Sequence, residues 1–69
     1  MTPTEIGQAI KNQRYKLNIS QQLLGGLIDR SRYSVERAEN YTADVTVKNL
    51  LKVLDTLNLE LIIREKPTA

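Results

Sequence analysis

The sequence predicts a small, mostly α-helical domain of four helices followed by one short C-terminal β-strand. Four segments place apolar residues near the helical period, and each begins directly after a Thr or Ser that can cap a helix. The final apolar segment instead alternates and is rich in β-branched residues, which is typical of a strand. We therefore expect the helical domain in residues 1–58, the strand in residues 59–65 and a tail in residues 66–69.

The first helix is expected from Pro3 to about Leu17. Thr2 precedes it as the N-cap, Pro3 takes the first helical position, and Glu5 completes a capping box. Asn18 follows, where a residue in the left-handed conformation can end the helix. The apolar stripe expected to face the core consists of Ile6, Ala9, Ile10 and Leu17.

The second helix is expected at residues 21–28, capped by Ser20. Gly25 suits a close crossing with another helix, whereas Gly26 has no evident role and costs helix stability. The side chains expected to turn inward are Leu23, Leu24, Leu27 and Ile28.

The third helix is expected at residues 32–39, after a break at Asp29 and a cap at Ser31. Only Val35 and Ala38 are suited to burial, so this helix commits little of its surface to the core. The polar face left exposed consists of Arg32, Tyr33, Ser34, Glu36 and Arg37. Such a face suggests a use other than packing.

The fourth helix is expected at residues 47–57, after a loop at residues 40–45 and a cap at Thr46. Its apolar face is the broadest in the chain, which predicts the main core helix. That face consists of Val47, Leu50, Leu51, Val53, Leu54 and Leu57.

The predicted strand, residues 59–65, has no second strand to pair with in this sequence. A lone strand leaves its backbone donors and acceptors unsatisfied, so we expect it to pair with the same strand of a second copy. The alternative is a strand lying against the fourth helix of its own chain. The residues expected at the dimer contact are Leu59, Leu61, Ile62 and Ile63.

Composition excludes most enzyme chemistry. The 69 residues contain neither His nor Cys, which removes the usual zinc ligands, the commonest general base and any disulfide. The acidic residues show no spacing typical of a metal site, and no Gly-rich phosphate loop occurs, so we expect a non-enzyme without cofactor or metal.

The net charge of +2 permits a nucleic-acid partner without requiring one. No signal segment or membrane span is evident, and we expect a cytoplasmic, nucleoid-associated protein.

Two short helices joined by a tight turn, the second with an exposed polar face, have the form of a helix-turn-helix. Residues 20–40 resemble, without a gap, the Cro/CI-type (XRE family) helix-turn-helix of phage repressors and bacterial regulators. The resemblance implies a lambda-repressor-like four-helix fold. The matching details are Ser20-Gln21, Gly25 at the crossing, Ser31-Arg32 at the turn, Val35 inside and Glu39-Asn40 at the end.

The flanking segments are similar to HipB-type antitoxins, which pair with HipA-type kinase toxins. The similar segments are residues 6–11 and 50–61. In that subfamily a short C-terminal strand pairs with its two-fold mate, so the resemblance also implies a homodimer. It further implies two partners, double-stranded operator DNA and a HipA-like serine/threonine kinase toxin.

The resemblance places Gln21 and Gln22 beside a DNA phosphate, and Arg32 and Arg37 facing the major groove, where arginine can read guanine. Arg30 stands where the family has an apolar residue, and it can send its head towards a phosphate. The implied DNA-binding set is Gln21, Gln22, Arg30, Ser31, Arg32, Tyr33, Ser34, Arg37 and Asn40. Arg14 and Glu39 fall where the family often has a structural ion pair.

Several of these residues also have a purely structural interpretation. Arg32 and Arg37 taken alone are ordinary solvated arginines, and Tyr15 and Tyr41 suit packing better than ligand contact. Glu36 lies on the same helix as the two arginines, and the role we favour for it is to orient one of them.

The function these observations favour is a sequence-specific repressor that binds a palindromic operator as a dimer and serves as a HipB-like antitoxin. The alternative is a free-standing or phage-type repressor without a toxin partner. Nothing in the residues themselves indicates which surface would bind a toxin.

Overall fold

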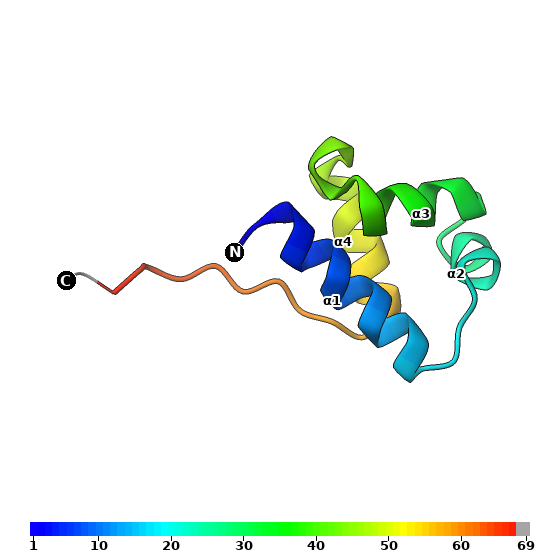
Figure 1. Ribbon diagram of the computed structural model, residues 1–69, viewed down its shortest axis with the longest axis horizontal. Coiled ribbons are helices and arrows are strands. Elements are labelled where there is room, and N and C mark those ends of the chain that lie inside the picture. The colour runs from blue at the N-terminus through cyan, green and yellow to red at the C-terminus, as the bar shows by residue number, and fades with distance from the viewer. Residues whose placement is uncertain (68–69) are drawn as a thin grey trace.

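The computed structural model describes residues 1–67 and contains four α-helices and one 3-10 helix within them. Figure 1 shows the helices gathered into one body, from which the C-terminal segment leaves as an extended trace. The elements are α1 (Pro3–Lys16), α2 (Gln21–Leu27), α3 (Arg32–Asn40), the 3-10 helix η1 (Thr42–Asp44) and α4 (Val47–Thr56). The four predicted helices are confirmed, and η1 lies in the segment predicted as a loop.

All four predicted N-caps are confirmed. Each cap side chain accepts a hydrogen bond from the backbone N–H three residues later, which satisfies a donor that the helix cannot. At α1 the capping box is complete, because the Thr2 N–H also donates to Glu5 Oε1 at 3.3 Å. The caps are Thr2, Ser20, Ser31 and Thr46.

Three polar residues in the left-handed conformation end three of the helices. Asn18 and Asp29 have φ values of 58° and 59°, as expected from the sequence, and follow α1 and α2. Asn58 has a φ of 61° and does the same after α4, which the sequence analysis did not predict. Asn and Asp adopt this conformation at less cost than other side chains with a Cβ.

The core lies where one face of each helix meets the others. Its buried residues are Ile10, Leu24, Ile28, Val35, Ala38, Leu50, Val53, Leu54 and Leu57. The prediction was too broad, because six further apolar residues expected inside are exposed. They are Ala9, Leu17, Leu23, Leu27, Val47 and Leu51. Leu24 of α2 and its C-cap Ile28 lie on the side that packs against the other helices, so the neighbouring Leu23 and Leu27 point to solvent.

Two glycines allow elements to approach closely. A Cβ on Gly25 would lie 2.6 Å from the carbonyl carbon of Ser31, which confirms the expected close crossing. A Cβ on Gly7 would collide with the Glu39 carbonyl oxygen and lie 2.5 Å from Thr42 Oγ1. The chain thus needs a glycine at position 7 to seat α1 against the end of α3, which sequence reasoning missed.

The C-terminal segment is not paired within the described residues. Leu59 is half-buried against the core, and its N–H donates to the Leu54 carbonyl at 2.8 Å. Beyond it residues 60–67 are exposed, and no strand occurs in residues 1–67. This arrangement does not support the alternative of a strand packed on α4. The strand and its pairing across a dimer stay predictions, and part of the predicted tail, residues 68–69, lies outside the described residues.

Candidate nucleic-acid interface

Helices α2 and α3 form a tight unit around the turn at residues 28–31. The Arg30 N–H donates to the Gly25 carbonyl at 2.7 Å, and the absence of a side chain at Gly25 lets the turn lie directly on α2. Val35 and Ala38 bury one side of α3. The helical period therefore turns Tyr33, whose exposed fraction is 63%, to the opposite side.

A buried ion pair fastens α1 to the end of α3. Arg14 Nε lies 2.6 Å from Glu39 Oε2, Arg14 Nη2 donates to Glu39 Oε1 at 3.2 Å, and both side chains are almost fully enclosed. Arg14 Nη1 donates to the Ile19 carbonyl at 3.0 Å, which also ties down the connection to α2. The hydrogen bond to Glu39 raises the pKa of Arg14 above its usual value, although burial opposes this. These are the two residues for which the resemblance implies an ion pair.

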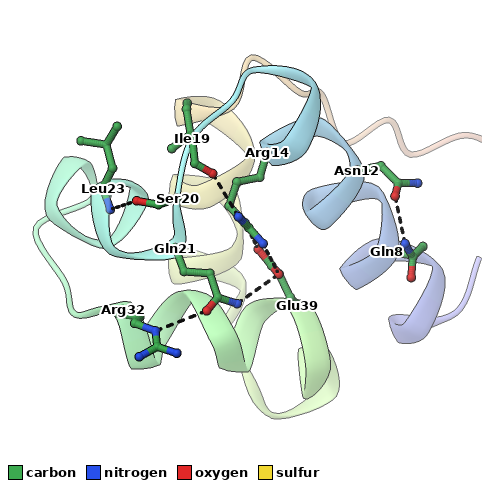
Figure 2. Close-up of polar contacts among 9 residues, drawn as sticks. All are labelled: Gln8, Asn12, Arg14, Ile19, Ser20, Gln21, Leu23, Arg32 and Glu39. Carbon is green, nitrogen blue, oxygen red and sulfur yellow. Dashed lines mark hydrogen bonds and ion pairs between the residues drawn. The ribbon is translucent and has the colours of Figure 1, made fainter.

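Gln21 connects this ion pair to the surface of α3. Its Nε2 donates to Glu39 Oε1 at 3.3 Å, and its Oε1 accepts from Arg32 Nε at 3.5 Å. Figure 2 shows the Gln21 side chain lying between the other two. An amide can donate and accept at once, so one side chain orients Arg32 against a charge that is itself fixed.

A first hollow of about 450 Å³ opens on one side of α3. It contains Gln21, Gln22, Arg32 and Asn40 from the predicted set, together with Lys11 and Tyr15 of α1. Arg14 stacks over the Tyr15 ring at 4.7 Å, so Tyr15 is exposed but held in place. Sequence reasoning missed Lys11 and Tyr15, because their place beside α2 and α3 depends on how α1 packs.

A second, smaller hollow of about 130 Å³ lies on the other side of α3, against η1 and α4. Three cationic side chains line it, those of Arg30, Arg37 and Lys52. Arg30 Nη2 donates to Asn49 Oδ1 at 3.3 Å, which links the turn to α4. Asp44, Asn49 and Lys52 belong to this hollow and were missed, since no local pattern relates η1 and α4 to α3.

The predicted DNA-binding residues thus fall on both flanks of α3 and along its exposed side. Ser34 lines the second hollow, while the Ser31 hydroxyl accepts from the Ser34 N–H at 3.4 Å and so serves as a cap. The role favoured for Glu36 was wrong. In the described part of the chain, Gln21 bonds to Arg32 and Asp44 pairs with Arg37, and no side-chain hydrogen bond or ion pair joins either arginine to Glu36.

Two short helices crossing at a glycine, with an exposed polar second helix flanked by basic hollows, define the class as a helix-turn-helix protein. No protein-family model and no curated protein matches the sequence. Among residues 1–67 no helix could span a membrane, and no group of acidic residues could hold a metal ion.

Several solved structures share this fold. A HipB variant in complex with an O2 20mer has a TM-score of 0.88 at 22% identity, covering 97% of this chain and 93% of that chain. A HipA–HipB–O2–O3 complex has a TM-score of 0.89 at 22% identity, covering 97% and 94%. A chain described as an MDT protein gives the same values. The fold is therefore similar to that of HipB, which confirms the predicted HipB-type helix-turn-helix.

Proposed function

We propose that the protein is a sequence-specific DNA-binding repressor that acts as the HipB-like antitoxin of a type II toxin–antitoxin system. The observation that carries the proposal is the α3 surface, where Arg32 and Arg37, each held by a neighbouring side chain, line two hollows that also contain other basic and polar groups. A HipB of the same fold forms a complex with an O2 20mer, which supports assigning this surface to duplex DNA.

In this proposal α3 enters the major groove. Arg32 and Arg37 each read a guanine through its O6 and N7 atoms, which discriminates against other bases by about 1 to 3 kcal/mol per pair. Tyr33, at the crest, packs on a base edge. Because the phosphate strands border the groove, we assign the backbone contacts to other cations of the two hollows, namely Lys11 in the first and Arg30 and Lys52 in the second.

The proposed protein acts as a dimer, and the unpaired C-terminal segment supports this part of the proposal. Residues 59–65 of two copies pair about a two-fold axis, and the two α3 helices then address half-sites about 34 Å apart on a palindromic operator. The exposed Leu61, Ile62 and Ile63 support this pairing, because a monomer leaves them in water.

The toxin partner is a HipA-like serine/threonine kinase. The support is the complex of HipA, HipB, O2 and O3, in which the HipB fold matches this chain. The protein acts in the cytoplasm, where both partners are found, and has no catalytic role of its own.

The test is fluorescence anisotropy on the DNA upstream of the protein's own gene and on a scrambled duplex of equal composition. At near-physiological salt, where backbone-only binding is weak, the upstream duplex is expected to bind at least a hundredfold tighter. Equal affinity for the two duplexes overturns the proposed repressor. Co-purification with a kinase encoded beside the gene then separates an antitoxin from a free-standing repressor.

A further inference from the structure

Arg37 lies close to two neighbouring side chains at the surface of α3. Its Nη2 lies 3.9 Å from Asp44 Oδ2, and its guanidinium carbon lies 5.9 Å from the centre of the Tyr33 ring. The Arg37 side chain is 39% exposed, so it is held without being removed from solvent. The ring and the carboxylate limit the directions in which it can point.

Asp44 is itself fixed by the fold. It ends η1, where its N–H donates to the Tyr41 carbonyl at 2.9 Å. Thr42, at the start of η1, is buried and donates to the Ala38 carbonyl at 2.5 Å, and its hydroxyl lies against Gly7 of α1. The carboxylate is therefore carried on an anchored turn and not on a free loop.

Within residues 1–67, Asp44 is also the only acidic side chain that lines the second hollow, among three cations. A carboxylate and a phosphate both accept hydrogen bonds from a guanidinium, and both are anions, so each excludes the other from the same arginine. Guanine offers neutral acceptors, which a nearby carboxylate repels far less than it repels a phosphate.

From this arrangement we propose that Asp44 is a specificity-determining residue. Its carboxylate occupies the side of Arg37 that a backbone phosphate would otherwise take, which reserves Arg37 for base edges and weakens binding that uses the backbone alone. The proposal rests on the DNA-binding function above. It assigns to an acidic residue outside α3 a role in rejecting unspecific DNA.

The test is Asp44→Asn, which keeps the shape and removes the charge. Its affinities for the upstream and scrambled duplexes are measured by anisotropy over a series of salt concentrations. Affinity for the scrambled duplex is expected to rise about tenfold, and its log–log salt slope to steepen by about 0.9, because Arg37 gains a phosphate. The upstream duplex is expected to change less than threefold, so the discrimination ratio falls.

The matched control is Asp55→Asn, an equal change of charge at an exposed residue of α4 that lines neither hollow. It is expected to shift both duplexes by the same small factor, while Asp44→Glu is expected to keep the wild-type ratio. An unchanged ratio and salt slope in Asp44→Asn, or the same ratio change in Asp55→Asn, overturns the proposal. If the wild-type protein itself does not discriminate, the repressor function has failed, and the role of Asp44 fails with it.

Discussion

At the scale of single residues, the strongest polar feature is the Arg14–Glu39 pair. Both groups are enclosed, and each takes two of its three side-chain hydrogen bonds from the other. Replacing one member leaves a buried charge without compensation, which costs far more than loss of a surface pair. The pair also holds Gln21, so a structural ion pair and the exposed side of α3 share one network.

We expect Glu39→Gln to lower the free energy of unfolding by about 3 kcal/mol, because Arg14 keeps its charge in an enclosed site. Equilibrium unfolding in urea measures the change. Glu36, on the same helix, forms no ion pair with an arginine in residues 1–67, and Glu36→Gln is expected to cost less than about 0.5 kcal/mol. Equal costs for the two variants would show that the pair contributes no more than surface charge.

Gln21→Ala is expected to reduce discrimination between upstream and scrambled DNA about tenfold, or ~1.4 kcal/mol. Arg32 loses the partner that orients it, while the buried ion pair keeps its own contacts. Anisotropy on both duplexes provides the measurement. The control is Gln22→Ala, since Gln22 lines the same hollow but its side chain makes no hydrogen bond within residues 1–67. A similar loss in both variants would contradict an orienting role for Gln21.

At the scale of elements, α2 shows what a glycine does in two different surroundings. The helix has seven residues, and Gly25 and Gly26 are adjacent in it. A Cβ on Gly25 would lie 2.6 Å from the carbonyl carbon of Ser31 in the turn. Nothing lies within 4 Å of the place where a Cβ on Gly26 would stand. Nothing in the structure explains Gly26.

Replacing each glycine by alanine should therefore have opposite results. We expect Gly25→Ala to lower the free energy of unfolding by about 2 kcal/mol, because backbone atoms must move to admit the Cβ. We expect Gly26→Ala to raise it by about 0.5 to 1 kcal/mol, because alanine restricts the unfolded chain and fits a helix. Thermal unfolding followed by circular dichroism measures both. A loss of stability in both variants would mean that α2 tolerates no added side chain.

The elements also show which features a sequence can predict. Caps and left-handed helix ends depend on neighbours three or four residues away, so Ser20, Ser31 and Asn18 could be assigned from local chemistry. Other features depend on elements that are distant in the chain. They are the close approach of α1 to α3 at Gly7, the hydrogen bond from Gln21 to Glu39, and the ion pair of Asp44 with Arg37. Periodicity likewise predicts an apolar stripe on a helix but not how much of that stripe is buried, because the number of helices that cover it is a property of the whole fold.

At the scale of the whole molecule, the helical body and the C-terminal segment differ in how their backbone is satisfied. The body pairs its groups in helices and caps, while residues 60–67 extend away from it in Figure 1. Ile63 is 91% exposed there. Exposed alternating apolar residues with free backbone groups favour pairing with another strand.

We expect Ile63→Lys to shift the protein from dimer to monomer, with unchanged helical content. The new charge replaces an apolar contact of the strand pair, and it lies away from the core. Sedimentation at several protein concentrations detects the shift. Leu23→Lys makes the same change at an exposed leucine of α2 and is expected to leave the dimer intact. A monomeric wild-type protein, or equal loss in both variants, would contradict pairing through the segment.

The proposed pairing of the C-terminal segment also depends on whether the two paired chains are identical. In an antiparallel pair centred on Ile62, Leu61 lies opposite Ile63 of the second copy, and Glu60 lies opposite Arg64. This register leaves Leu59 opposite Glu65 at the ends. Moving the centre by one residue to either side loses both Glu60–Arg64 pairs and places Ile62 opposite a charged residue. In a mixed pair with a related chain that carries like charges at positions 60 and 64, one of the two contacts between these positions becomes repulsive. The proposed pairing would therefore favour identical copies over mixed pairs.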